Sequence, residues 1–510
     1  MSPSRSCRGT AGLGVAAVTL LLAGCFAGDP GGSTGSAGDP GGTGAAAGER
    51  LRLALAFPPR AALSPFTDDS VLIARMGVAE TLVVFDEAGA AQPNLAESWE
   101  YTDPRTVSLE LRDGVTFHDG SPMDAEAVAG ALTAAAAADP APRAISGIGL
   151  TARAVDADTV ELQAAEADPL LVQRLAAPPL AVLAPAAYTD PAAPDPVGTG
   201  TGPFEITAVD GESGATLEAF VEHWAGAPAL SGIDARFVSD ADTRTNALRA
   251  EEVDVAQNIP IAQLSALDPE QLVSVPLPRL TGLFLNTSTG PFTDAGLRTA
   301  AAEAVDPGPV VEQIYEGQVD PADGFLAEQV RGGQTLPEVT RAPATDPAGA
   351  AVRLATWNDR PELPEAAAVV VDQLRSAGFA VELVVQDYAT LEPELLAGGF
   401  DAVLASRLYL GDTGDPVGYF ATDVTCEGSF NLARLCDPAL DAAVAEARTL
   451  TDPAERRAAA VEIEAQVLGT GAFVPLLHER SRIGVLPGVT GVAADPFERR
   501  LVTVDTAVQR

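Results

Sequence analysis

The chain has 510 residues and a formal net charge of −40, with 71 acidic against 31 basic residues. So acidic a chain is not expected to bind nucleic acid, which requires basic patches, or to lie directly on an anionic lipid surface. The length allows two or three domains with ample core.

The first 24 residues have the layout of a secretory signal peptide. Arg5 and Arg8 precede the apolar run AGLGVAAVTLLLA, which ends in small residues. This run is shorter than the about 20 apolar residues that a membrane-spanning helix needs. The stretch LAGC at 22–25 resembles the lipobox of bacterial lipoproteins, which implies cleavage before Cys25 and a diacylglyceryl group on its thiol. The alternative is an ordinary signal peptide followed by a chance cysteine.

Residues 25–49 are expected to form the lipidated cysteine and a flexible linker. Residues 27–46 repeat the motif AGDPGG and consist mostly of Gly, Ala, Ser, Asp and Pro. Such a composition buries too little apolar surface to offset the entropy of ordering the chain.

The remainder alternates apolar, β-branched segments with alanine-rich segments, as expected for an α/β fold. Two helices are expected where an aspartate can cap the first turn, over 124–138 from Asp124 and over 242–250 from Asp242. Strands are expected at 51–57, 106–112, 204–209, 282–288 and 501–508.

A β-α-β-α-β unit is predicted late in the chain. Its strands are VRLATW, AVELVVQ and DAVLASRL, and the elements in order are 352–357, 364–377, 380–386, 391–397 and 401–408. Such a unit builds a parallel sheet with right-handed crossovers.

Ligands of open parallel sheets sit beyond the carboxyl ends of the strands, which here are followed by WNDR at 357–360 and YLGDTGDP at 409–416. The candidate ligand-binding residues are Trp357, Asn358, Arg360, Tyr409 and Asp412. A solvated loop arginine is the alternative for Arg360, and a turn-stabilising aspartate is the alternative for Asp412.

No catalytic motif is apparent. GESGA at 211–215 is not a G-x-S-x-G nucleophile motif. GTGTG at 198–202 precedes a proline and an expected strand, so a turn is predicted there and not a phosphate-binding loop.

Cys426 and Cys436 are expected to form a disulfide, since an even pair at short range in an exported protein is most simply a bridge. A metal site is the rival interpretation, but His118, His223 and His478 are scattered, and no CxxC or HExxH motif occurs. No metal and no cofactor are expected.

The stretch PNLAESWEYTDPRTVSLELRDGVTFHDGSPMDAEAV at 93–128 resembles the signature of family 5 extracellular solute-binding proteins. Further blocks resemble that family in the same order, at 222–255, 283–306 and 451–478, so that the resemblance covers residues 50–510. GTGTGPF departs from the family pattern by two extra residues, and 320–350 matches no family block.

The resemblance implies a two-lobed α/β fold of the periplasmic-binding-protein type (class II), with an extra inserted domain and hinged lobes around an interlobe cleft. It places lobe I at 50–70, 195–283 and 484–510, the inserted subdomain at 71–194 and lobe II at 284–483. His118 and Trp99 belong to the family's signature block and are interpreted as packing and turn residues.

The resemblance also implies a function. The family binds peptides, dipeptides or nickel and delivers them to the permease of an ABC importer. Residues 406–444 are most similar to its peptide-binding branch, which implies that Asp412 pairs with the peptide ammonium and that Tyr409 walls a side-chain pocket. Arg360 is the candidate for the peptide carboxylate, by bidentate pairing.

The chain is therefore expected to be a monomeric, non-enzymatic receptor, anchored by lipid on the extracytoplasmic face of the cell membrane. The alternatives are a receptor of the same fold for nickel chelates, sugars or another metabolite, an exported hydrolase, and a surface adhesin with a degenerate cleft.

Overall fold

The computed structural model describes residues 48–509 apart from 88, 359 and 412. The predicted signal peptide, Cys25 and most of the linker lie outside the described residues, and so does Asp412. In the part of the chain that is described, no helix combines the length and the apolar character needed to cross a bilayer.

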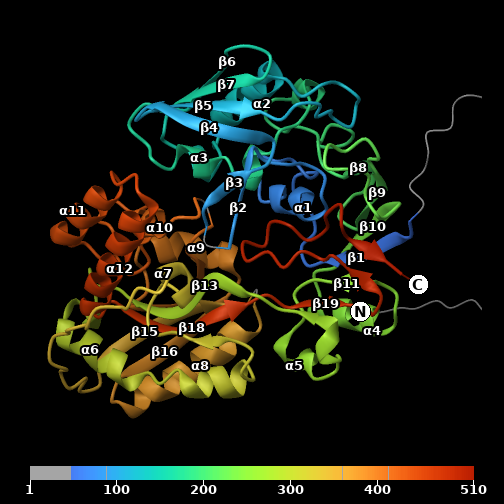
Figure 1. Ribbon diagram of the computed structural model, residues 1–510. Helices are drawn as coiled ribbons and strands as arrows, with labels where there is room; N and C mark the ends of the chain where they lie inside the picture. Colours follow the sequence, from blue (N-terminus) through green and yellow to red (C-terminus); the bar gives the residue numbers. More distant parts are fainter. Residues whose placement is uncertain (1–47, 88, 359, 412, 510) are drawn as a thin grey trace, which may run out of the picture. The chain divides into compact units, whose positions relative to one another are not determined.

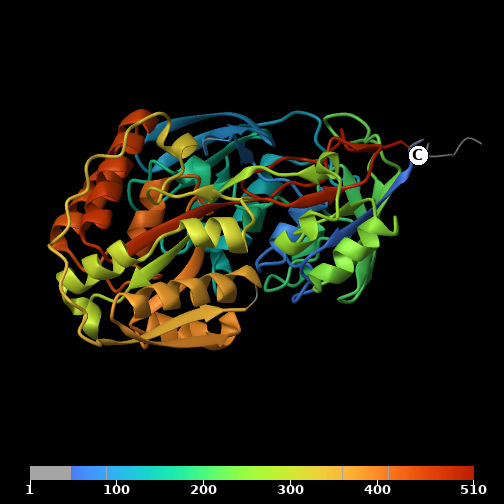
Figure 2. The ribbon, with the colours of Figure 1, turned by 90° about the horizontal axis from the view of Figure 1, so that it is seen from below.

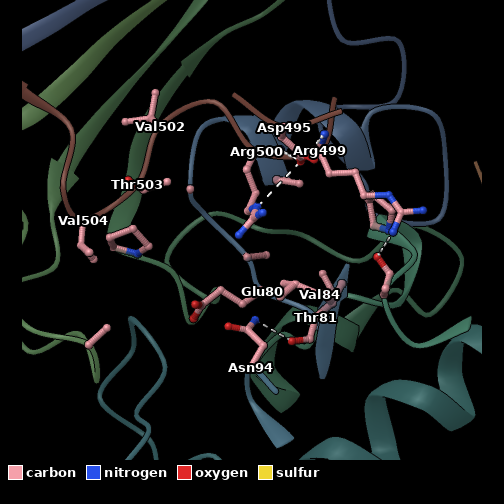
Figure 3. Close-up of a pocket in the computed structure, with 18 of the residues that line it drawn as sticks. Glu80, Thr81, Val84, Asn94, Asp495, Arg499, Arg500, Val502, Thr503 and Val504 are labelled. Atoms are coloured by element: carbon pink, nitrogen blue, oxygen red, sulfur yellow. Dashed lines mark hydrogen bonds and ion pairs between the residues drawn. The ribbon is translucent and has the colours of Figure 1, made fainter. Parts of the chain in front are cut away.

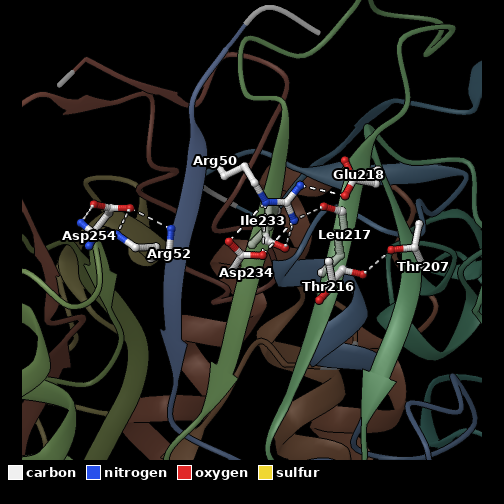
Figure 4. A network of polar contacts seen from close by, with 9 residues as sticks. All are labelled: Arg50, Arg52, Thr207, Thr216, Leu217, Glu218, Ile233, Asp234 and Asp254. Atoms are coloured by element: carbon white, nitrogen blue, oxygen red, sulfur yellow. Dashed lines mark hydrogen bonds and ion pairs between the residues drawn. The ribbon is translucent and has the colours of Figure 1, made fainter. Parts of the chain in front are cut away.

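The first sheet has seven strands in the order β12-β19-β11-β1-β10-β9-β8 (Figure 1). Its central strand β1 (Arg50–Leu55) buries Leu51 and Leu53 and turns Arg50 and Arg52 outward. Those arginines pair with acids of neighbouring segments, Arg50 with Asp234 and Glu218 and Arg52 with Asp254 (Figure 4). The other strands are β8 (Phe204–Asp210), β9 (Gly214–Ala219), β10 (Gly232–Phe237), β11 (Val255–Ala256), β12 (Leu272–Val273) and β19 (Ile483–Val485).

A smaller antiparallel sheet has the order β4-β5-β7-β6 and is covered by helix α2 (Ala125–Ala137). Asp124 caps α2 by accepting a hydrogen bond from the Ala127 N–H at 2.9 Å, which confirms the predicted helix start. The strands are β4 (Ala96–Asp103), β5 (Thr106–Leu111), β6 (Thr151–Ala154) and β7 (Thr159–Gln163), with the β2 (Val83–Phe85) and β3 (Ala91–Pro93) pair beside them.

The third sheet has six strands in the order β14-β18-β13-β17-β15-β16. It contains the predicted β-α-β-α-β unit, because β15 pairs in parallel with both β16 and β17. Apolar residues of α8, such as Val370 and Leu374, are fully buried. The elements are β13 (Pro276–Leu285), β14 (Asp320–Pro321), β15 (Ala351–Trp357), α8 (Glu362–Ser376), β16 (Ala380–Gln386), α9 (Tyr388–Leu396), β17 (Ala402–Leu408) and β18 (Phe473–Arg480).

The chain passes between the seven-stranded and six-stranded sheets twice, from β12 to β13 and from β18 to β19. The two crossings are hydrogen-bonded to each other, since Val275 and Ser481 exchange bonds of 2.8 and 3.0 Å. The boundary predicted after residue 283 falls inside β13. Both strands that pair with β13 belong to the six-stranded sheet. The division into lobes otherwise stays a prediction.

Three helices lie between β17 and β18 in the chain, α10 (Pro416–Asp423), α11 (Pro438–Ala447) and α12 (Pro453–Gly469). Cys426 and Cys436 are joined by a disulfide between α10 and α11. Segment 332–349, for which the sequence offered no alignment, runs along α12 and α6 (Ala295–Ala304) (Figure 2). Arg341 donates to the Leu468 carbonyl and the Thr345 N–H to the Gly296 carbonyl, so this segment is fastened to helices.

Three local predictions were wrong in detail. The helix predicted over 242–250 is present as α4 (Ala241–Arg249), but its cap is Asp240, which accepts the Thr243 N–H, and not Asp242. The strand predicted over 282–288 ends at Leu285, because the Asn286 side chain accepts the next N–H groups and turns the chain. Only β21 (Ala507–Val508) remains of the strand predicted over 501–508, since the Thr506 hydroxyl closes a turn with Thr503 and Gly491.

The turn predicted at 198–202 is confirmed. A Cβ at Gly200 would lie 2.0 Å from the Val78 carbonyl oxygen, and one at Gly202 would lie 2.3 Å from that of Gly77. These glycines therefore permit close packing of two backbones. His118 completes the turn through a 2.8 Å contact from Nε2 to the Gly202 carbonyl.

Candidate functional site

Five charged side chains meet at the carboxyl ends of β15 and β17, and we call them the strand-end cluster. Two of them come from α1 (Ser70–Arg75) and from the C-terminal segment, residues 486–509. The other three come from β13, from the residues that follow β15 and from β18. The members are Arg75, Arg279, Arg360, Glu479 and Glu498.

Glu479 is the most extensively bonded carboxylate of the strand-end cluster. Its carboxylate accepts hydrogen bonds from Thr281 at 2.8 Å and Ser406 at 2.5 Å, and it pairs with Arg360 at 2.6 Å. Burial raises the pKa of Glu479, but Arg360, Arg279 and the Ser406 hydroxyl outweigh it and lower the pKa to about 2. The carboxylate is therefore ionised at any physiological pH.

Glu498 joins the C-terminal segment to the other arginines. Its carboxylate lies 3.2 Å from Arg279 and 4.0 Å from Arg75, and its backbone carbonyl accepts a 2.6 Å bond from Arg75 Nε. Burial raises the pKa of Glu498, but Arg279, Arg75 and Arg360 outweigh it and lower the pKa. Its backbone is left-handed, with a φ of 56°. An unfavourable backbone held by a buried ion pair marks a segment whose position is closely specified.

The strand-end cluster carries more positive than negative charge, with three arginines against two glutamates. Burial, and then repulsion from Arg360, lowers the pKa of Arg279. Arg279 Nε is buried and has no hydrogen-bond partner among the described residues. An unsatisfied buried donor and a surplus of cations favour an incoming carboxylate.

The residues predicted after β15 have different surroundings. Trp357 is buried and packs edge to face on Tyr388, with ring centroids 5.2 Å apart. Asn358 is exposed, and its N–H donates to the Gln386 carbonyl. Arg360 keeps 36% of its side chain exposed while it pairs with Glu479, so it is the one of the three with a charged group near solvent.

Tyr409 lies in the interior of the fold. It is 2% exposed, its hydroxyl accepts the Ala327 N–H at 3.0 Å, and its ring faces Tyr419 and His478. Burial raises the pKa of Tyr409 above its ordinary value. Its role as the wall of a ligand pocket stays a prediction.

The loop that carries position 412 is anchored on both sides. The Tyr409 N–H donates to the Pro278 carbonyl at 2.9 Å. Asp415 caps α10 by accepting from Val417 and Gly418, and it pairs with Arg456 through two bonds of 2.8 and 2.9 Å. A doubly bonded, nearly buried arginine gives this end of the loop a fixed geometry.

The three histidines do not form a common metal site. Within the described part of the chain, no group of three or more His, Cys, Asp or Glu side chains could hold a metal ion. Burial, and then Arg331, lowers the pKa of His478 to about 4, so this side chain is neutral at physiological pH. His118 lies near the turn at 198–202, and His223 lies near Trp224.

Sequence reasoning missed four members of the strand-end cluster, all except Arg360. The available signal was a charge within an apolar strand, as for Arg279 in PLPRLTGLFL and Glu479 in FVPLLHER. A charged residue is almost never fully buried unless it is paired. The sequence does not reveal which distant charges pair, because α1, β13, β18 and the C-terminal segment meet only in the fold.

Comparisons with known proteins agree on one family. Residues 90–431 match the sequence model of the bacterial extracellular solute-binding proteins, family 5. The glutathione-binding protein GsiB of Pectobacterium atrosepticum is 26% identical over 76% of this chain and 80% of its own length.

Solved structures of similar fold include NikA from Brucella suis in complex with Fe(III)-EDTA, with a TM-score of 0.77 and 21% identity over 90% of this chain and all of that one. A dipeptide-binding protein from Pseudoalteromonas sp. SM9913 in complex with Met-Leu has a TM-score of 0.75 and 18% identity at the same coverage. These likenesses show the two-lobed α/β fold of the periplasmic binding proteins.

Proposed function

Because the chain belongs to family 5 of the bacterial extracellular solute-binding proteins, we propose that it captures short peptides between its lobes and delivers them to the permease of an ABC importer. The family consists of extracytoplasmic transporter components that bind a ligand without converting it. Three statements go beyond the family: that the ligand is a peptide, that it binds in a defined orientation, and that the chain carries a lipid anchor.

The surplus positive charge of the strand-end cluster is the observation that carries the peptide proposal. Arg360 is partly exposed, and Arg279 has a buried N–H without a partner among the described residues, so both can donate to a peptide carboxylate. Asp412 follows the strand end by four residues and is proposed to receive the peptide ammonium. Two charges of opposite sign would favour short peptides with free ends.

Isothermal titration with a di-, tri- and pentapeptide panel tests the proposal. Asp412→Asn should lower the affinity for a free-amine dipeptide about tenfold or more, and it should leave the affinity for the N-acetylated dipeptide nearly unchanged, since that form has no ammonium. Arg360→Gln should lower the affinity for the free dipeptide but not the affinity for its C-terminal amide, which has no carboxylate. Asp372→Asn, at an exposed position on α8, is the matched control.

Equal loss for free and blocked peptides would refute the two charge roles. If the protein bound a nickel–histidine chelate or a sugar and no peptide, the ligand would be assigned to that class instead. A cleaved peptide in mass spectrometry after incubation would instead identify a hydrolase, and ligand-dependent closure in small-angle scattering would argue against an adhesin.

The membrane anchor has its own test. Cys25 is proposed to carry the lipid that holds the monomeric chain on the outer face of the cell membrane, within reach of the permease. Cys25→Ser should release the protein from the membrane fraction and leave peptide affinity unchanged. Retention in that fraction would contradict the proposal.

A further inference from the structure

A cavity of about 240 Å³ lies between residues 79–94, which lead into and include β2 and β3, and the C-terminal segment (Figure 3). None of the five residues of the strand-end cluster lines it. Its walls are largely apolar and include Phe85, Trp224 and Phe497. We call it the side cavity. A concave apolar space with a few polar groups is the usual form of a small-molecule site.

An acid and a base face this space from opposite sides. Figure 3 shows the Arg500 side chain reaching into the cavity across from Glu80 and Asn94. Among the described residues, Arg500 pairs with Asp495, at 3.7 Å from Nε. The Asp495 carboxylate already accepts three backbone N–H groups, from residues 497, 499 and 500. The Arg500 guanidinium therefore has N–H groups available to a ligand.

Glu80 is held with its carboxylate at the cavity wall. The Trp224 indole N–H is shared between its two oxygens, at 3.0 and 3.2 Å, and His223 Nε2 lies 3.4 Å away. A carboxylate has about four acceptor sites, so one indole N–H leaves capacity for further donors. An ammonium group would supply both those donors and the balancing charge.

We propose that the side cavity binds a free α-amino acid, or a zwitterion of that size, with its carboxylate on Arg500, its ammonium on Glu80 and its side chain against the aromatic wall. In the described part of the chain, two acids and two arginines line the cavity. Asp495 accepts three backbone N–H groups and Arg499 donates to two carbonyls, so a zwitterion would place its two charges on Glu80 and Arg500. Asn94 lies on the same side of the cavity as Glu80, at the ammonium end, and its amide N–H donates to the Thr81 carbonyl (Figure 3).

The size of the cavity sets the size of the ligand. Drug-sized ligands occupy clefts of about 300–1,000 Å³, while an apolar cavity of about 150 Å³ holds one benzene ring. A volume of about 240 Å³ lies between them and suits a single amino acid with an apolar side chain. A peptide of several residues exceeds this volume.

Titration calorimetry of the purified protein with leucine, methionine and phenylalanine tests the proposal. Leucine should bind, and leucinamide and N-acetyl-leucine should bind about tenfold or more weakly, because each lacks one charge. Arg500→Gln should lower the affinity for leucine by about 10- to 100-fold. Ala225→Phe, at an exposed lining position, should block leucine without touching either charged group.

Arg375→Gln is the matched control, since Arg375 is also about half exposed and 3.6 Å from an aspartate, but on α8. Neither it nor Arg360→Gln should change leucine affinity, while Arg360→Gln should weaken the dipeptide. Failure of all three amino acids to bind would overturn the proposal. So would unchanged leucine affinity in Arg500→Gln or Ala225→Phe, or loss of leucine binding in Arg360→Gln, which would assign leucine to the strand-end cluster.

Discussion

Replacing Glu479 by glutamine tests the electrostatic account of the strand-end cluster. The introduced amide side chain keeps an oxygen for Thr281 and Ser406, so the hydrogen bonds at that oxygen survive. Its other terminal atom becomes an N–H donor that faces the Arg360 guanidinium. The substitution thus removes one charge and leaves the arginines of the cluster without their central counterion.

The size of the effect follows from the pKa of Glu479. The carboxyl falls from its ordinary 4.5 to about 2, and each pKa unit corresponds to 1.36 kcal/mol. Ionised Glu479 therefore stabilises the folded state by about 3 kcal/mol, close to the 3–5 kcal/mol expected for breaking a buried pair. Because the pKa is lowered on folding, this stabilisation is complete above pH 4.5 and is lost as the pH falls through about 2.

Urea unfolding followed by circular dichroism measures the difference, from the shift in midpoint and the slope. Wild type should exceed Glu479→Gln by about 3 kcal/mol at pH 7, and the gap should narrow toward zero between pH 4.5 and 2. Glu394→Gln is the control, because its pair with Arg353 is about half exposed and should contribute at most about 1 kcal/mol. A gap that stays constant with pH would refute the reasoning.

Three further changes address other contacts. Cys436→Ser should lower the free energy of unfolding by about 2–3 kcal/mol, because it frees a short loop in the unfolded chain, and reduction of the wild type should have the same effect on the urea midpoint. Asp415→Asn should destabilise by about 3 kcal/mol through the unpaired Arg456, whereas Asp415→Asn combined with Arg456→Met should recover part of that loss. Asp124→Ala should lower the free energy of unfolding by about 1 kcal/mol as a lost helix cap; no change would mean that the cap contributes nothing.

Elements whose signal is local were predictable. The β-α-β-α-β unit from β15 to β17 alternates apolar strands with helices of regular period, and all five elements lie where they were predicted. The errors came from side chains that bind backbone a few residues away. Asn286 and Thr506 each stop a strand that apolar patterning alone would continue.

The candidate site was less predictable for a physical reason. Arg360 follows a strand end and could be found from the order of the elements, but Arg75 and Glu498 lie more than four hundred residues apart in sequence. Their pairing depends on how α1 and the C-terminal segment pack. Patterning indicates that a residue is buried; it does not indicate which distant charge neutralises it.

Arg499 connects regions that the chain keeps far apart. Its guanidinium donates to the carbonyls of Ala176 and Gly411 and lies over the Phe85 ring, so one side chain lines the side cavity and also holds the residue that precedes position 412. If an occupant of the side cavity displaces Arg499, its contact with Gly411 changes as well. By thermodynamic reciprocity, a ligand bound at that loop would then change the occupant's affinity by the same factor.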